Sequence, residues 1–119
     1  MDEAARELAL VRKAICSGLS NCYDWYDDKV VARVRSDASL QGLQPQYIKA
    51  RLYQYVAEEN GKIDQRREQR PEYSDRDYWY RVCIPEDGFP RGIFVEIILE
   101  NPDDDCPVVA LVNAHAQRS

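Results

Sequence analysis

The chain contains a single histidine, His115, near the end of an apolar segment that is typical of a β-strand. Histidine is the side chain whose ordinary pKa lies closest to neutral pH, so it is the usual proton donor or acceptor in catalysis. Glu96 lies in the middle of another strand-like segment, and Arg81 lies in a third. A carboxylate, an imidazole and a guanidinium can together move protons beside a phosphate and stabilise its charge. Whether these three act together depends on the strands that carry them.

Three segments in the C-terminal part of the chain are predicted to be strands. Polar and apolar residues alternate from 78 to 84 and from 93 to 99, and residues 108–115 form a third strand-like segment. Residues 86–92 contain glycine and proline, and residues 101–107 contain asparagine, aspartate and proline, so both segments are predicted turns. Connections this short favour an antiparallel meander.

The pairing of these strands determines which side chains share a face of the sheet. Registers that place Arg81 opposite Glu96, and Glu96 opposite Asn113, also set apolar residues against apolar residues. They place Leu99 opposite Ala110 and leave residues 103–106 as a four-residue hairpin loop. One face is then apolar and carries Tyr80, Val82, Ile84, Ile93, Val95, Ile97, Leu99, Val108, Ala110 and Val112. The other face is polar and aromatic, and carries Trp79, Arg81, Phe94, Glu96, Asn113 and His115.

This second face holds the groups needed to cleave RNA through its 2′-hydroxyl without a metal. Glu96 is the candidate general base for the 2′-hydroxyl proton, and His115 is the candidate general acid for the leaving 5′-oxygen. Arg81 is placed to brace the phosphate and the charge that develops on it. The candidate contacts to the nucleic acid are Trp79, Phe94 and Asn113, with the two aromatic rings stacking a base.

The same face also has a purely structural interpretation. An antiparallel sheet that packs helices on one side leaves its other side to water, and Arg–Glu pairs across strands are ordinary there. Such an exposed pair contributes only about 0–1 kcal/mol to stability. A wet sheet face and a catalytic face are therefore both open readings of these residues.

The order of elements, with helices before a C-terminal antiparallel sheet, adds a family resemblance. With Glu96 in mid-strand, Arg81 on a neighbouring strand and His115 near the chain end, residues 45–119 resemble the barnase–EndoU–colicin–RelE group of small ribonucleases, which includes many bacterial toxin domains. The resemblance implies metal-independent RNA cleavage and a cognate inhibitor protein. The chain differs from that group in its acidic charge and in showing three readable strands, where four or more are usual.

The N-terminal half is predicted to be mainly helical. Residues 1–18 have apolar side chains at helical spacing and a glycine at the end. Asp27 or Asp28 caps a short helix over residues 28–36, although its three valines leave a strand as the competing reading. Pro45 suits the first turn of a helix that Asn60 and Gly61 end, with Gly61 in the left-handed conformation. Residues 62–77 are predicted to be a charged, solvated connector, with an exposed helical turn as the alternative for its first half.

Together these elements predict an α+β fold, with N-terminal helices packed on one face of a C-terminal three- to four-stranded antiparallel sheet. A chain of 119 residues with 45% apolar residues is expected to form one domain, spanning residues 1–119. Its acidic N-terminus lacks the apolar stretch of a signal peptide, so a cytoplasmic protein is expected.

Charge and cysteine content narrow the classes of function. The net charge of −5 repels phosphate backbones at long range, which argues against a nonspecific nucleic-acid binder. The acids and bases of residues 44–91 balance, so a local basic patch remains open there. The four cysteines are expected to be reduced thiols, and with one histidine they give no usual zinc spacing. We therefore expect no metal and no cofactor.

Two minor cysteine interpretations stay open: a disulfide between Cys16 and Cys22, and a nucleophile pair of Cys83 or Cys106 with His115. A larger alternative is a protein that binds without chemistry. The eight tyrosines and the acidic charge suit a partner protein of basic character, as in an immunity protein or antitoxin that covers a nuclease. The partner predicted from the sequence is therefore either RNA or a protein, and no membrane.

Overall fold

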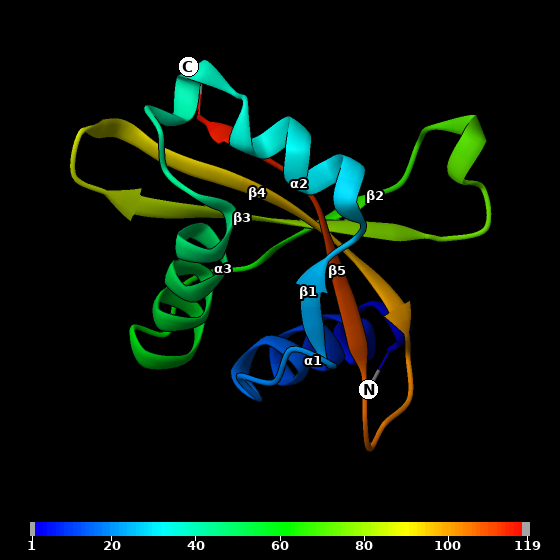
Figure 1. The fold of residues 1–119 in the computed structure, drawn as a ribbon. Coiled ribbons are helices and arrows are strands. Elements are labelled where there is room, and N and C mark those ends of the chain that lie inside the picture. The colour runs from blue at the N-terminus through cyan, green and yellow to red at the C-terminus, as the bar shows by residue number, and fades with distance from the viewer. Residues whose placement is uncertain (1, 118–119) are drawn as a thin grey trace.

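Helices and strands follow one another in a computed structural model that describes residues 2–117 (Figure 1). The elements are α1 (Glu3–Cys16), β1 (Tyr23–Trp25), α2 (Asp28–Arg35), the 3-10 turn η1 (Ala38–Leu40), α3 (Pro45–Tyr53), the π-helical turn η2 (Gln54–Glu58), β2 (Asp64–Arg67), the 3-10 turn η3 (Pro71–Tyr73), β3 (Tyr78–Glu86), β4 (Phe89–Asn101) and β5 (Val108–Ala116). The strands form one sheet in the order β1-β5-β4-β3-β2. Among the strand pairs of residues 2–117, β1–β5 alone is parallel.

The predicted α+β class and the helices before a mainly antiparallel sheet are confirmed, but the sheet has five strands. The two additional strands lie at its edges. β1 has only three residues, which is too few for a pattern to show. β2 reads Asp-Gln-Arg-Arg and occupies the segment predicted as a connector, where its polar side chains lie at an exposed edge. Charged residues on an edge strand deter pairing with another chain, which explains why β2 has no apolar alternation.

The helices begin where the capping residues indicate. The Asp2 side chain accepts from the Ala5 N–H at 2.7 Å, and the Asp27 side chain accepts from the Val30 N–H at 2.9 Å. Residues 28–35 are therefore a helix, and the competing strand is excluded. Among residues 2–117, no helix is both long enough and apolar enough to cross a membrane.

The end of α3 differs from the prediction in one detail. The helix does begin at Pro45, but Asn60 takes the left-handed conformation, with a φ of 52°, and Gly61 does not. Gly61 instead lies against the Tyr55 ring, where an added Cβ would come within 2.4 Å of ring carbons. The glycine is needed for close packing, and asparagine tolerates the positive φ.

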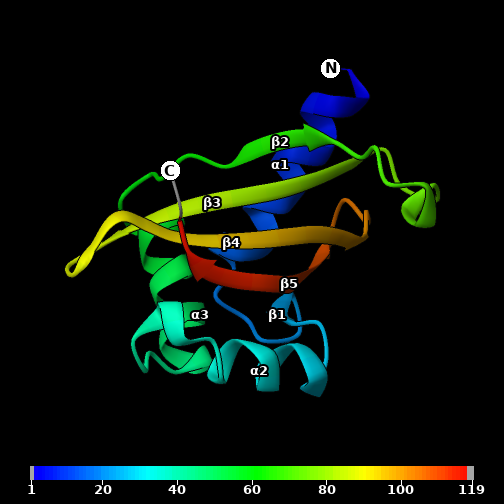
Figure 2. The ribbon, with the colours of Figure 1, turned by 90° about the horizontal axis from the view of Figure 1, so that it is seen from above.

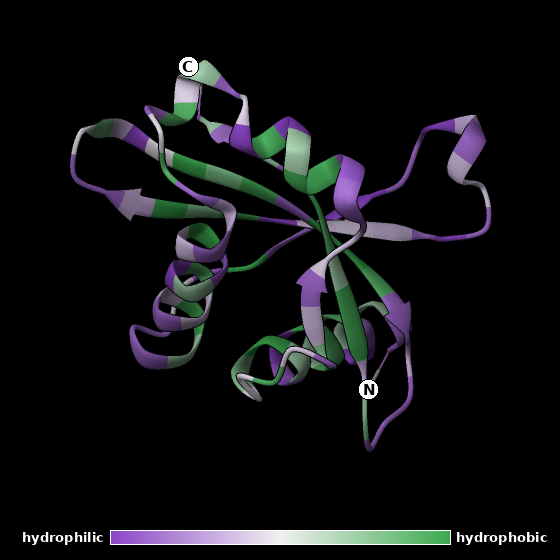
Figure 3. Cartoon of the chain, in the orientation of Figure 1, coloured by the Kyte–Doolittle hydropathy of each residue, from purple (hydrophilic) through white to green (hydrophobic). Residues whose placement is uncertain are grey.

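The core lies between the sheet and the helices α1 and α3, and α2, which runs along the edge of the sheet beside β5 and β1 (Figure 2), adds Val30 and Val34 to it. Its fully buried side chains include Val11 and Ile15 of α1, Ile48 and Leu52 of α3, and Tyr80 of β3. Figure 3 shows apolar residues along β4 and β5 and polar residues along the connector before β3. This contrast separates the elements that form the core from the connector, which projects beyond the end of β2 and the start of β3 (Figure 1).

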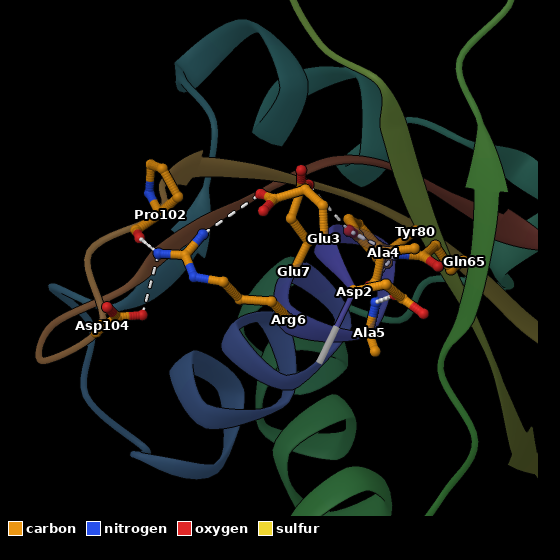
Figure 4. Close-up of polar contacts among 10 residues, drawn as sticks. All are labelled: Asp2, Glu3, Ala4, Ala5, Arg6, Glu7, Gln65, Tyr80, Pro102 and Asp104. Atoms are coloured by element: carbon orange, nitrogen blue, oxygen red, sulfur yellow. Dashed lines mark hydrogen bonds and ion pairs between the residues drawn. The ribbon is translucent and has the colours of Figure 1, made fainter.

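Polar contacts at the N-terminus hold α1 against the sheet (Figure 4). The Tyr80 hydroxyl donates to Glu7 Oε1 at 3.2 Å, and Gln65 Nε2 donates both to the Ala4 carbonyl and to the Tyr80 hydroxyl. Burial raises the pKa of the Glu7 carboxyl, against the effect of the Tyr80 hydrogen bond. One tyrosine thus joins the helix to both β3 and the edge strand β2.

The predicted register of β3 with β4 is correct, and that of β4 with β5 is correct up to Glu96 and wrong beyond it. Arg81 lies opposite Glu96, and Glu96 lies opposite Asn113. A β-bulge then leaves Val112 unpaired, so Leu99 lies opposite Val109 and not Ala110. Because of this shift Val109 and Leu111 face the core, in place of Val108, Ala110 and Val112. The hairpin loop also spans residues 102–107 and not the four predicted residues, because Asn101 pairs with Val108.

Candidate functional site

The six candidate residues lie on three neighbouring strands, on the sheet face that is turned away from the core. We call this surface the polar face, and it consists of Trp79, Arg81, Phe94, Glu96, Asn113 and His115. Residues that are opposite each other in neighbouring strands share a face, so the register itself brings them together. Their side chains, however, take different partners.

The imidazole of His115 is held by an aromatic neighbour. Its ring stacks on Phe94 with ring centres 4.8 Å apart and planes 16° from parallel. His115 Nδ1 lies 2.9 Å from the Ala116 carbonyl oxygen, which only accepts, so Nδ1 is the nitrogen that donates in this contact. Phe94 is 9% exposed and also contacts the Trp79 ring, at 6.4 Å between centres. Phe94 therefore supports the histidine from beneath and has little free ring surface.

The carboxylate of Glu96 is paired with an arginine that the sequence reading did not include. Arg70 Nη2 donates to Glu96 Oε2 at 3.0 Å. The same guanidinium donates twice to Glu68, from Nε at 2.9 Å and from Nη2 at 3.1 Å. These bonds from Arg70 lower the pKa of Glu68, whose side chain is 1% exposed. Two carboxylates thus share one arginine beside the polar face.

Planar groups around Arg70 order the connector between β2 and β3. The Arg70 guanidinium lies 4.7 Å from the centre of the Tyr73 ring and 5.8 Å from the centre of the Trp79 ring. Arg76 covers Tyr73 as well, at 4.9 Å. Alternating guanidinium and aromatic planes attract each other through the ring quadrupole. The connector, predicted to be solvated, is in this way folded back over the sheet.

Arg81 is directed toward the edge of the sheet. Its Nε donates to Asp64 Oδ2 on β2 at 3.2 Å, and Asp64 is also its partner in the β2–β3 register. Burial opposes ionisation of Asp64, but hydrogen bonds from Lys62 and Arg81 outweigh it and lower the pKa of that carboxyl. The arginine that contacts Glu96 is Arg70, and the arginine that lines a pocket with His115 is Arg33.

Two pockets that share Arg33 lie along the polar face. The first, of about 310 Å³, contains Glu96 and four cationic side chains but only one further carboxylate. The second, of about 280 Å³, is lined by Arg33, Asp37, Asn113 and His115. We call the two together the Arg33 groove, and its charged and polar lining is Asp27, Lys29, Arg33, Asp37, Arg70, Arg76, Glu96, Asn113 and His115.

The bulge in β5 helps to position Arg33. Arg33 Nη2 donates to the carbonyl of Val112, the residue that the bulge leaves unpaired. Helix α2 therefore presents an arginine to the groove while it satisfies a backbone oxygen on the exposed edge of β5. A second backbone group of β5 is satisfied from η1, where the Ser39 hydroxyl oxygen accepts from the Ala116 N–H at 3.1 Å.

The structure thus gathers three of the candidate residues, Glu96, Asn113 and His115, in one groove. Trp79 and Arg81 lie on the β3 side of the polar face, toward β2. Sequence reasoning missed Arg33, Arg70 and Arg76. The only signal for the last two was the balanced charge of residues 44–91, which left room for a local basic patch.

Within residues 2–117 no group of three or more histidine, cysteine, aspartate or glutamate side chains is arranged to hold a metal ion. Comparison with protein-family models, with curated proteins and with solved structures finds no match for this chain. The roles of the polar-face residues therefore rest on their chemistry and geometry, and the resemblance to small ribonucleases stays a prediction.

Proposed function

We propose that the protein cleaves single-stranded RNA in the Arg33 groove, without a metal, through attack of the 2′-hydroxyl on the neighbouring phosphate. One observation carries the proposal: in an acidic chain, four cationic side chains gather around Glu96 in a pocket that shares Arg33 with the pocket of the only histidine. A local cationic groove attracts a phosphate even where the net charge of the chain opposes it.

The positions of Glu96 and His115 suit a general base and a general acid on opposite sides of a phosphate. Glu96 is paired with Asn113 and His115 with Phe94, so Glu96 and His115 are diagonal neighbours on adjacent strands. Diagonal neighbours lie about 7–8 Å apart, which leaves room for a phosphate between the two side chains. In the proposed reaction Glu96 takes the proton of the 2′-hydroxyl, and protonated Nε2 of His115 gives a proton to the leaving 5′-oxygen.

Arginines supply the remaining electrostatic part of the proposal. Arg33 lines both pockets, so we assign it the contact with the phosphate and with the charge that develops during attack. Arg70 Nη2 donates to Glu96 Oε2 and so holds that carboxylate in position beside the groove. Tyr26, which is 54% exposed and lines the groove, offers a free ring for a base to stack on, and Trp79 stays a candidate for the same role.

The proposal is tested by cleavage of a fluorescent RNA oligonucleotide in buffer containing EDTA. We expect His115→Ala and Glu96→Gln each to slow cleavage by about 10²–10⁴-fold, the usual contribution of one positioned acid or base. Arg33→Ala is compared with Arg35→Ala, a matched loss of one positive charge from the same helix at a residue outside the groove lining. Equal cleavage rates for the wild type and both catalytic variants would show that Glu96 and His115 do not catalyse the cleavage.

A second candidate function, binding of a basic protein partner, is favoured by a different surface. A pocket of about 400 Å³ between α1, the connector and the end of β4 is lined by five carboxylates and one cation. The carboxylates belong to Glu3, Glu7, Asp75, Asp77 and Glu100. A partner of basic character complements this charge. Under this alternative a lysine-rich peptide binds the wild type at low salt, and Glu100→Lys weakens that binding while Arg33→Ala does not.

A further inference from the structure

We propose that Cys22 and Cys106 are a disulfide-forming pair, which cross-links the start of β1 to the loop between β4 and β5 when the chain meets a disulfide oxidant. The proposal concerns a part of the molecule remote from the polar face and does not depend on the proposed function. It replaces the Cys16–Cys22 pairing that the sequence left open.

The fold brings these two cysteines together from distant parts of the sequence. The Cys22 carbonyl accepts from the Val109 N–H at 2.8 Å, and the parallel pairing of β1 with β5 continues from Tyr23 opposite Val109. Cys106 lies just before β5, in the loop that leads into the same strand. The Cys22 side chain is the largest cause of the raised pKa of the Cys106 thiol, so the two side chains lie close enough to interact.

The loop that carries Cys106 is held in place on α1. Arg6 Nη2 donates to the Pro102 carbonyl and to the Asp104 carboxylate, both at 3.0 Å (Figure 4), and Lys13 Nζ donates to the Asp104 carbonyl at 2.6 Å. Within the loop, the Asp103 carboxylate accepts from the Cys106 N–H at 3.0 Å. These bonds fix the position of the loop that carries Cys106 relative to α1.

The two thiols differ in access, which assigns their roles in the reaction. Cys106 is exposed and Cys22 is 5% exposed. The Cys106 thiolate attacks one sulfur of an oxidant such as oxidised glutathione and releases one glutathione thiolate. The Cys22 thiolate then attacks the Cys106 sulfur and releases the second glutathione. Two protein thiols lose two electrons and two protons, and one glutathione disulfide gains them.

The ionisation of Cys106 determines how the rate of cross-linking varies with pH. The neighbouring Cys22 sulfur and the hydrogen bond to it raise the pKa of the Cys106 thiol. Because only the thiolate attacks, we expect the cross-link to form faster as the pH rises above neutral.

The test oxidises the full chain with glutathione disulfide, alkylates the remaining thiols and maps the tryptic peptides by mass spectrometry. Trypsin leaves Cys16 and Cys22 in one peptide, since no lysine or arginine separates them, so the mapping uses the Cys16→Ser chain. In that chain Cys22, Cys83 and Cys106 fall in separate peptides. We expect one species, two mass units lighter than the reduced chain, in which the Cys22 and Cys106 peptides are joined.

Two variants make the outcome decisive. Cys106→Ser, at an exposed position, is expected to fold normally by circular dichroism and to lose the cross-link completely, whereas Cys83→Ser retains it. Oxidation is also expected to raise the Tm of the wild type and to leave that of Cys106→Ser unchanged. A glutathione adduct that persists on Cys106, a cross-link between other cysteines, or three alkylatable thiols in the treated Cys16→Ser chain would each overturn the proposal.

Discussion

The side chain of Glu68 is almost fully covered, and its partner explains how the fold accommodates its charge. The side chain is 1% exposed and accepts two hydrogen bonds from Arg70, which also holds Glu96. A buried carboxylate is tolerated only when it is paired in this way. The stability of the connector over the sheet therefore depends on the ionisation of Glu68.

This pairing predicts how stability varies with pH. The pKa of Glu68 in the fold lies below its ordinary value of 4.5, because of the hydrogen bonds from Arg70. Its contribution to the free energy of unfolding is full above about that pH and is lost as the pH falls through the lowered pKa. We expect Glu68→Gln to lower the free energy of unfolding at pH 7 by about 1–2 kcal/mol, since water partly screens Arg70. Urea unfolding at pH 7 and pH 3 measures the difference, which is expected to shrink at the lower pH.

Glu72→Gln is the matched control, because Glu72 is exposed in the same connector. We expect this variant to unfold like the wild type at both pH values. A Glu68→Gln deficit that is equally large at pH 3 would contradict the assignment to a charged pair.

At the scale of single elements, a glycine shapes the hairpin between β3 and β4. Gly92 has a φ of +79°, and an added Cβ would lie 2.6 Å from the Ile84 carbonyl oxygen. Gly42 has a similar φ of +86° but open space around it. We expect Gly42→Ala to cost about 1–2 kcal/mol of stability, the usual cost of the left-handed conformation. Gly92→Ala is expected to cost more, because a β-strand backbone cannot move away cheaply, and thermal unfolding of the two variants gives the comparison.

The start of α2 offers a second test at this scale. Asp27 accepts from the Val30 N–H and is the capping residue, whereas Asp28 is the first residue of the helix. We expect Asp27→Ala to lower the free energy of unfolding by about 1 kcal/mol and Asp28→Ala to lower it less. Chemical denaturation of both variants measures the two losses. A larger loss for Asp28→Ala than for Asp27→Ala would contradict the assignment of Asp27 as the capping residue.

The elements also show why sequence reasoning succeeded in part. Long segments with a clear period, such as 78–84 and 93–99, were predicted as strands with the correct register around Glu96. The bulge at Val112 was not predictable, because a one-residue shift preserves an apolar pattern in a segment where nearly every residue is apolar. The edge strand β2 was missed because an edge is stabilised by polar side chains that carry no periodic signal.

At the scale of the whole molecule, charge is distributed unevenly, and this has a consequence for ligand binding. The chain carries −5, while Lys29, Arg33, Arg70 and Arg76 surround Glu96. If RNA binds there and meets two or three of these cations, its affinity falls with salt with a log–log slope of about −1.4 to −2. Fluorescence anisotropy with a short RNA at several salt concentrations measures the slope. We expect Arg33→Ala to make it shallower by about 0.7 and Arg35→Ala to leave it unchanged.

The composition of the groove could be predicted only in part. Glu96, Asn113 and His115 share a face because of strand register, which a sequence pattern reports. Arg33 reaches the groove from a helix, and Arg70 reaches it from a connector folded back by stacking on Tyr73 and Trp79. Such long-range contacts depend on how elements dock, and local patterns contain no information about docking.

The most direct test of the central claim compares two oligonucleotides that differ in one oxygen atom. One is all RNA, and the other has a deoxyribose in place of the ribose at the cleaved position. With EDTA present, the proposed mechanism predicts cleavage of the all-RNA strand to a product with a 2′,3′-cyclic phosphate, and no cleavage of the strand that lacks the attacking 2′-hydroxyl. Equal cleavage of the two strands, or cleavage of neither by the wild-type protein, would contradict it.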